Sequence, residues 1–257
     1  DEEQKDADRQ ENTDRKESDE AQKDADQPEN TDRQESADRQ PQPQQAAPAA
    51  AAASAPGFCD HIITVINKAA TALKLTLKDV KIDVSDTGNY SADGKAALSV
   101  QGEGNVEIEL DGDNVLKSGY DRAGLEKNTS KGTLTLKDDK EAGSGSLKAE
   151  GGDCGAGIGG GECYNGENIT ITGGSVTAFG GEWAAGIGGG DGGAAENITI
   201  TGGTVTAAGG YYGAGIGGGS GGSGKNITIT GGTVNAAGGW GGAGIGGGIS
   251  GSGKNKK

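Results

Sequence analysis

The chain has few of the residues that build a thick core or an active site. Of its 257 residues, only 31% are hydrophobic and 4% are aromatic. A compact globule of this length needs more large apolar side chains to offset the entropy lost when its chain is ordered. The chain also contains one His, His61, and a single Arg, Arg122, beyond residue 40. These shortages argue against an ordinary α/β enzyme and favour a disordered chain, a fibrous repeat or a thin solenoid.

Positive charge and long apolar runs are scarce as well. The formal net charge is −15, and residues 1–40 hold 16 acidic side chains against 7 basic ones. Such a chain repels phosphate backbones, so we expect no nucleic-acid partner. No apolar run reaches the roughly 18 residues that a membrane-spanning helix needs, so we expect no membrane insertion.

The N-terminal 56 residues carry an acidic repeat and a linker. A segment that begins at Gln4 returns at Gln22, and no Leu, Ile, Val or aromatic residue precedes Phe58. Because nothing here can be buried, we predict that residues 1–56 are disordered, with a Pro/Ala/Gln tether over residues 40–56. Residues 57–72 contain an apolar run compatible with a helix, which predicts an N-terminal cap for a repeat domain over residues 73–257.

What the chain has in excess is glycine, arranged in a repeat of 29 residues. Of the 53 Gly, 42 lie after residue 150, and AGIGGG segments recur around Ile158, Ile187, Ile216 and Ile245. NITITGG segments open at Asn168, Asn197 and Asn226 with the same spacing. Each unit holds three short extended pieces bounded by Gly, which is what one coil of a parallel β-helix requires.

Apolar side chains alternate with polar ones inside each extended piece. Ile169 and Ile171 share one face, while Thr170 and Thr172 share the other. Stacked coils then form ladders of Ile and Val. Each fully buried Ile or Val side chain stabilises the fold by roughly 1.5–3 kcal/mol. Degenerate copies of the pattern begin at residue 73. The sequence therefore predicts an all-β fold, a right-handed parallel β-helix of about six coils.

The chain also resembles a known family. GNVEIELDGDNVLKSG at residues 104–119, AGLEKN, GTLTLKDD and the tandem GAGIGGG and NITITGG segments resemble Gly-rich parallel β-helix modules of secreted and cell-wall proteins of Clostridia-like bacteria. Proteins of this kind are often labelled as carbohydrate-binding-domain proteins. The resemblance implies a secreted protein at the bacterial cell surface, with a polysaccharide, glycan or cell-wall component as partner. It also implies that the acidic leader is the mature start of an exported chain.

Catalytic and cofactor motifs match only in part. The GxGxxG at Gly155, Gly213 and Gly242 has no helix after it, as a dinucleotide site requires. A regular calcium-binding roll needs an acidic residue in every repeat, but Ser220 occupies the position of Glu162 and Asp191. A single calcium site near Asp111 and Asp113, or near Asp138, Asp139 and Glu141, stays an alternative.

Carboxylates are present but scattered along the sequence. Those in the repeats lie in variable turns and form no evident catalytic pair, namely Glu162, Glu167, Glu182, Asp191 and Glu196. We therefore expect a non-catalytic protein with no metal and no cofactor. A polysaccharide lyase or hydrolase built on the β-helix is the alternative, because such enzymes use clustered charged residues on one face.

Three cysteines leave several arrangements open. Cys154 and Cys163 flank one predicted strand, and a fully extended strand would hold them too far apart for a disulfide, whereas a folded-back turn would allow one. Cys59 lies in the predicted cap, and an odd count leaves at least one thiol unpaired. Among the repeated polar residues, we expect Asn168, Asn197 and Asn226 to form a hydrogen-bonded stack at a corner.

Two positions of the repeat bring aromatic residues into register. Five residues before the central Ile or Leu stand Tyr120, Asp153, Glu182, Tyr211 and Trp240, and four before it stand Asp121, Cys154, Trp183, Tyr212 and Gly241. The period places four rings on one corner of successive coils, and exposed rings form a platform for sugars. We therefore predict a ligand-binding site at Trp183, Tyr211, Tyr212 and Trp240. The alternatives are that these rings only cover Gly-rich turns of a structural spacer, or that the outward Thr pairs form an ice-binding surface.

Overall fold

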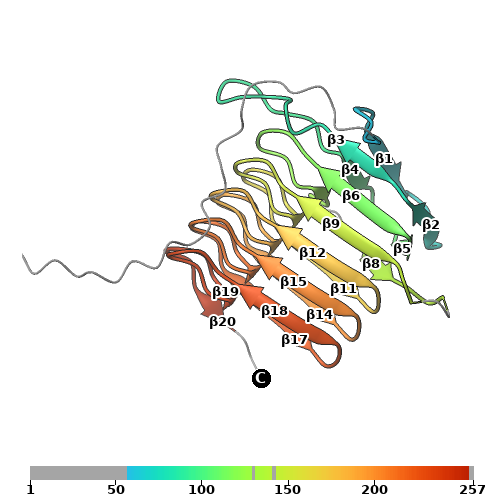
Figure 1. Ribbon diagram of the computed structural model, residues 1–257. Coiled ribbons are helices and arrows are strands. Elements are labelled where there is room, and N and C mark those ends of the chain that lie inside the picture. The colour runs from blue at the N-terminus through green and yellow to red at the C-terminus, as the bar shows by residue number, and fades with distance from the viewer. Residues whose placement is uncertain (1–56, 129–130, 141–142, 255–257) are drawn as a thin grey trace, which may run out of the picture. The chain divides into compact units, whose positions relative to one another are not determined.

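The computed structural model describes residues 57–128, 131–140 and 143–254. In these ranges the chain forms twenty strands in three sheets and no helix, and every pair of named strands is parallel (Figure 1). No segment there is a helix long and apolar enough to cross a bilayer. The predicted all-β parallel solenoid is confirmed, whereas the prediction of disorder for residues 1–56 lies outside the described residues.

The three sheets run along the stack of coils, and each coil contributes one strand to each sheet. Sheet I contains β2 (Leu73–Lys78), β5 (Val106–Asp111), β8 (Leu134–Lys137), β11 (Gly166–Ile171), β14 (Ala195–Ile200), β17 (Gly224–Ile229) and β20 (Gly253–Lys254). Sheet II contains β3 (Lys81–Asp83), β6 (Asp113–Lys117), β9 (Ser146–Glu150), β12 (Ser175–Phe179), β15 (Thr204–Ala208) and β18 (Thr233–Ala237). Sheet III contains β1 (Ile63–Ile66), β4 (Leu98–Gln101), β7 (Leu125–Glu126), β10 (Ile158–Gly159), β13 (Ile187–Gly188), β16 (Ile216–Gly217) and β19 (Ile245–Gly246). From β2 to β19 the chain completes six coils.

The core is a set of ladders between equivalent residues. Ile158 pairs with Ile187 in sheet III, Ile169 with Ile198 in sheet I, and Val176 with Val205 in sheet II. All of these side chains are fully buried. Because the 29-residue period sets this register, each coil covers the apolar side chains of the coil before it. The last coil has less cover, and Ile229 and Ile245 are exposed.

The segment expected to be compatible with a helix is a strand instead. β1 pairs with β4, with Ile63 opposite Leu98, and Cys59 forms a bridge to Ile82. The expectation of a helix is wrong because the edge of the first coil offers unpaired backbone groups, and a run of β-branched residues pairs with them readily. Residues 57–72 thus extend the solenoid by part of a coil.

Glycine follows the central Ile because successive coils nearly touch there. Gly159, Gly188, Gly217 and Gly246 have φ between 136° and 147°. A Cβ added at Gly188 would lie 2.0 Å from the carbonyl oxygen of Gly217 in the next coil. Only glycine combines this φ with so close a backbone approach. Successive coils are therefore in close backbone contact along the AGIGGG segments.

Candidate functional site

The four predicted ring residues lie on the turns that lead from sheet II to sheet III, which we call the II–III turns. Backbone hydrogen bonds hold successive turns in register: the Tyr212 N–H donates to the Glu182 carbonyl at 3.0 Å, and the Trp183 N–H donates to the Asp153 carbonyl at 3.3 Å. Equivalent side chains of neighbouring coils therefore lie one above the other, as the sequence predicts.

The structure brings all four rings into one continuous group, which we call the aromatic column. Trp183 stacks on Tyr212 with ring centroids 4.3 Å apart, and Tyr211 stacks on Trp240 at 5.8 Å with an interplanar angle of 7°. Tyr211 meets Tyr212 edge to face at 4.7 Å, which joins the two pairs. Trp240 is 73% exposed and Tyr211 50% exposed. The predicted clustering of these residues is confirmed, and their role in binding stays a prediction.

A second set of turns, which lead from sheet III to sheet I, lies against the II–III turns. The strands of sheet III in the Gly-rich coils are only two residues long, so the turns on either side of each strand are close together. The Glu162 N–H donates to the Asp121 carbonyl at 2.8 Å, and the Asp191 N–H donates to the Cys154 carbonyl at 2.9 Å. This contact places the side chains of the III–I turns beside the column positions.

Two adjoining cavities open where these turns meet. The larger, which we call the acidic cavity, has a volume of about 710 Å³. Its lining includes three rings, those of Tyr90, Tyr120 and Trp183, and six carboxylates, those of Asp93, Asp121, Asp153, Glu162, Glu182 and Asp191. Trp183 belongs to both the acidic cavity and the aromatic column. The cavity therefore continues the column toward the N-terminal coils.

Three of the carboxylates that are scattered along the sequence come together in the structure, whereas Glu167 and Glu196, expected in turns, lie on β11 and β14. Glu162, Glu182 and Asp191 line the acidic cavity, whereas Glu167 accepts a hydrogen bond from the Asn165 side chain at 2.8 Å. Carboxylates at the column positions of the earlier coils complete the group. The signal for these residues was present in the sequence, since Asp121, Asp153 and Glu182 occupy the same two repeat positions as the rings. Their meeting with Glu162 and Asp191 depends on the fold of the turns.

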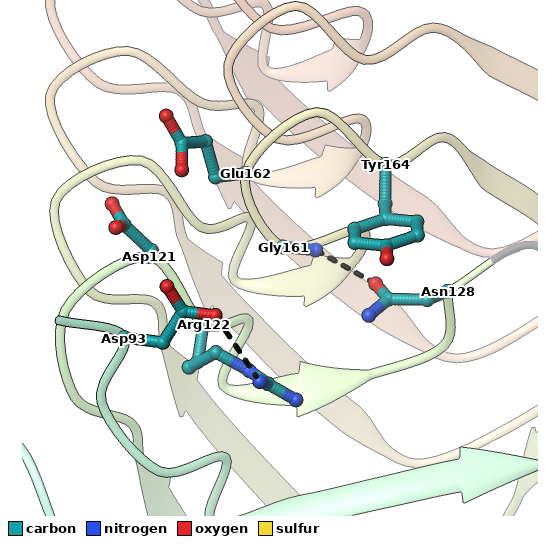
Figure 2. A pocket seen from close by; sticks show the side chains of 7 residues that line it. All are labelled: Asp93, Asp121, Arg122, Asn128, Gly161, Glu162 and Tyr164. Carbon is teal, nitrogen blue, oxygen red and sulfur yellow. Dashed lines mark hydrogen bonds and ion pairs between the residues drawn. The ribbon is translucent and has the colours of Figure 1, made fainter.

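The smaller cavity, of about 160 Å³, lies beside Arg122 (Figure 2). The Arg122 Nε donates to the Glu126 carboxylate at 2.7 Å, and its Nη1 lies 3.9 Å from Asp93. The side chain of Asn128 accepts a hydrogen bond from the Gly161 N–H at 2.9 Å, and the Tyr164 ring lies nearby (Figure 2). Glu126 is buried and pairs with Arg122. Its carboxylate therefore offsets much of the positive potential that the guanidinium group would otherwise produce in the acidic cavity.

The crowding of negative charge shifts several pKa values. Burial, together with the charges of Asp93, Asp153 and Asp191, raises the pKa of Asp121. The charge of Asp121 and partial burial raise the pKa of Glu162. Burial and nearby carboxylates also raise the pKa of the Tyr120 hydroxyl to about 12. Burial is the larger cause for Asp121 and Tyr120, and the charge of neighbouring carboxylates adds to it, whereas at Glu162 the charge of Asp121 is the larger cause.

One oxygen in this cluster lacks a partner. Asp121 Oδ1 is buried and makes no hydrogen bond within the described residues. One ligand atom each of Asp121, Cys154 and Glu162 lies within 4.8 Å of the others, a spacing that suits a metal ion. Burial raises the pKa of the Cys154 thiol, and the Asp121 carboxylate adds to that rise. These three residues therefore form a candidate cation site that the sequence did not indicate.

The cysteines and the other repeated polar residues take defined places. Cys59, Cys154 and Cys163 are free thiols, so the disulfide considered for Cys154 and Cys163 does not form. The predicted Asn stack is confirmed: the Asn197 side-chain amide donates to Asn168 at 3.1 Å, and that of Asn226 donates to Asn197 at 3.2 Å.

Carboxylates considered for a calcium site already have other partners in the structure. The Lys140 ammonium forms a hydrogen bond to Asp111 and lowers its pKa. Asp139 pairs with Lys137 at 2.7 Å, and Asp138 accepts a hydrogen bond from the Gly145 N–H at 2.9 Å. Glu141 lies outside the described residues.

Comparison with known proteins agrees with the fold. Four segments match a family model described as a beta helix repeat, at residues 143–162, 169–191, 198–220 and 227–249. The last three begin immediately after Asn168, Asn197 and Asn226, so these three matches start at the same point of a coil. No curated protein and no solved structure gave a significant match. The matched repeats and the stacked coils together identify a parallel β-helix repeat module.

Proposed function

We propose that the β-helix is a non-catalytic carbohydrate-binding module of a secreted bacterial surface protein, with the aromatic column as its contact surface. The observation that carries the proposal is the gathering of four rings on one corner, with Trp240 at 73% and Tyr211 at 50% exposure. Secretion and the bacterial surface rest on the resemblance of the repeats to cell-wall modules.

The column suits a sugar because its rings are held in place by the fold and stay partly uncovered. Tyr211 stacks on one face of Trp240, and the indole is still 73% exposed, so ring surface is available for the apolar face of a pyranose. Stacking of this kind draws on apolar burial and on contacts between ring and C–H groups, each ring contributing on the order of 1 kcal/mol. The rings lie outside the Ile and Val ladders, so their loss leaves the core intact.

The test is a glycan array with the full chain, followed by calorimetry on the ligands found. The double variant Trp183→Ala/Trp240→Ala should weaken binding about tenfold or more and leave the circular dichroism spectrum unchanged. Phe179→Ala is the matched control, because Phe179 is an outward ring on β12 and the paired position in β15 is already Ala208. The control should bind like the wild type.

Two outcomes would contradict the proposal. If no glycan binds the wild type, or if the folded double variant keeps its affinity, the rings only cover the turns. The interpretation as a structural spacer would then stand.

A second candidate is hydrolysis of the bound glycan, and one observation favours it. Carboxylate oxygens of Asp121 and Glu162 lie within 4.8 Å of each other, and the pKa of both groups is raised. Retaining glycosidases use two carboxyl groups at about 5 Å, one of them protonated. Release of reducing ends from a bound glycan by the wild type, and its loss in Glu162→Gln, would support this candidate over the binding module.

A further inference from the structure

The acidic cavity adjoins the aromatic column and carries most of its lining charge as carboxylates. Its six carboxylates come from turns of several coils, and the residues that line it include no Lys and no Arg. Arg122 lines the smaller cavity next to it and pairs with Glu126 and Asp93. A ligand that enters the acidic cavity therefore meets negative charge that Arg122 offsets only at Asp93.

The walls of the cavity combine this charge with aromatic faces. Tyr90 and Tyr120 lie with their ring centroids 6.5 Å apart on one part of the lining, and Trp183 lies on another. A cation gains from both kinds of wall, because carboxylates attract it directly and the faces of aromatic rings carry negative electrostatic potential. A volume of about 710 Å³ lies within the usual range for small-molecule sites of roughly 300–1,000 Å³.

Asp121 Oδ1 is buried and makes no hydrogen bond within the described residues, although the half-buried Asp121 carboxylate interacts with the Cys154 thiol beside it. A buried acceptor without a hydrogen bond is costly, and native structures keep few of them. An ammonium group supplies three N–H donors and a positive charge, and so satisfies this oxygen while it offsets the charge of the neighbouring carboxylates.

We propose that the acidic cavity binds the ammonium group of an amino sugar while an adjoining sugar ring stacks on Trp183, so that the module prefers glycans with free amino groups to N-acetylated or acidic ones. This inference rests on the proposed function, since it needs the aromatic column to bind carbohydrate. Uronates and sulfated sugars are excluded by repulsion from the same carboxylates. N-acetylation removes the charge and leaves only ring stacking.

The experiment compares three hexasaccharides by calorimetry on the full chain at physiological salt: one of glucosamine, one of N-acetylglucosamine and one of galacturonate. We expect the glucosamine hexamer to bind at least tenfold more tightly than the N-acetylated one, and the galacturonate hexamer not to bind. In the variant Glu162→Ser/Asp191→Ser the preference should fall to about threefold or less, with the affinity for the N-acetylated hexamer unchanged. This variant should fold, because Ser220 already occupies the equivalent position of the next coil.

A matched control separates the cavity from the overall charge of the chain. Glu167→Gln/Glu196→Gln removes the same charge from β11 and β14, outside the cavity. This control should keep the preference for the glucosamine hexamer over the N-acetylated one. An equal loss of preference in the control would show that the overall negative charge of the chain, and not the cavity, attracts the ligand, and would overturn the inference.

The remaining outcomes distinguish the inference from the proposed function. Equal binding of the two glucosamine-type hexamers by the wild type overturns the inference and leaves the carbohydrate-binding module standing. No binding of any glycan overturns both. Titration with ZnCl₂ tests whether a metal ion occupies the cavity instead. Two results together would assign the cavity to a metal ion: Glu162→Ser/Asp191→Ser abolishes stoichiometric zinc binding, and the same variant leaves the sugar preference unaffected.

Discussion

Replacing Gly188 by alanine should destabilise the β-helix at a point where two coils are in close backbone contact. Gly188 has φ +136°, and a Cβ there would lie 2.0 Å from the Gly217 carbonyl oxygen and 2.9 Å from the Ala195 Cβ. The same carbonyl accepts a hydrogen bond from the Gly189 N–H at 3.0 Å, so it cannot turn away without losing that bond. The substitution therefore combines backbone strain with the loss of an interstrand contact.

The magnitude follows from these two effects. A residue other than glycine in so rare a backbone region costs on the order of 1–3 kcal/mol. A displaced interstrand hydrogen bond costs about 1 kcal/mol more. We expect Gly188→Ala to lower the free energy of unfolding by about 3 kcal/mol, measured by urea denaturation followed by circular dichroism.

A second glycine provides the matched control. Gly192 also has a positive φ, +70°, but the nearest atom to an added Cβ is the Cys163 Cα at 4.0 Å. The equivalent residues Cys163 and Ser250 have φ values of 59° and 60°, so the repeat already accepts side chains there. Gly192→Ala should cost about 1 kcal/mol. Equal losses in the two variants would refute the role of the close approach between coils and leave only the backbone conformation.

Two further predictions concern buried ionisable groups. Burial of Lys127, which is 1% exposed, lowers its pKa to about 8. Below that pH the buried ammonium group destabilises the fold, and this destabilisation disappears as the pH rises toward 10.5, the ordinary pKa of lysine. The stability of the wild type relative to Lys127→Met should thus rise by roughly 3 kcal/mol between pH 7 and pH 10.5 in denaturation curves, and a constant difference would contradict the assigned pKa. Native protein should expose two thiols, Cys59 and Cys163, to a thiol-specific reagent, while buried Cys154 reacts only after unfolding; rapid reaction of all three thiols would show that the turn around Cys154 opens.

The sequence was sufficient for the repeated part of the fold because the period of 29 residues sets the register. Once Ile158 pairs with Ile187, every other residue of those coils has a fixed neighbour, so the ladders, the Asn stack and the aromatic column follow from spacing. Alternation of apolar and polar residues decides which side chains enter the core. This reasoning failed at residues 63–66, where an open strand edge, and not local helix propensity, decided the conformation.

The acidic cavity is a property that only the tertiary structure decided. Spacing predicts which residues stack along one corner, but it does not tell how two different turns of a coil lie against each other. That depends on the two-residue strands of sheet III and on glycines such as Gly188, which let the coils approach closely enough for the III–I turns to bond to the II–III turns. Glu162 and Asp121 lie far apart in the repeat pattern, and the backbone bond between their turns makes them neighbours. The sequence by itself therefore determined the coils and their ladders, whereas the meeting of charges at one corner came from turn geometry, because close backbone packing brings together groups that periodicity keeps apart.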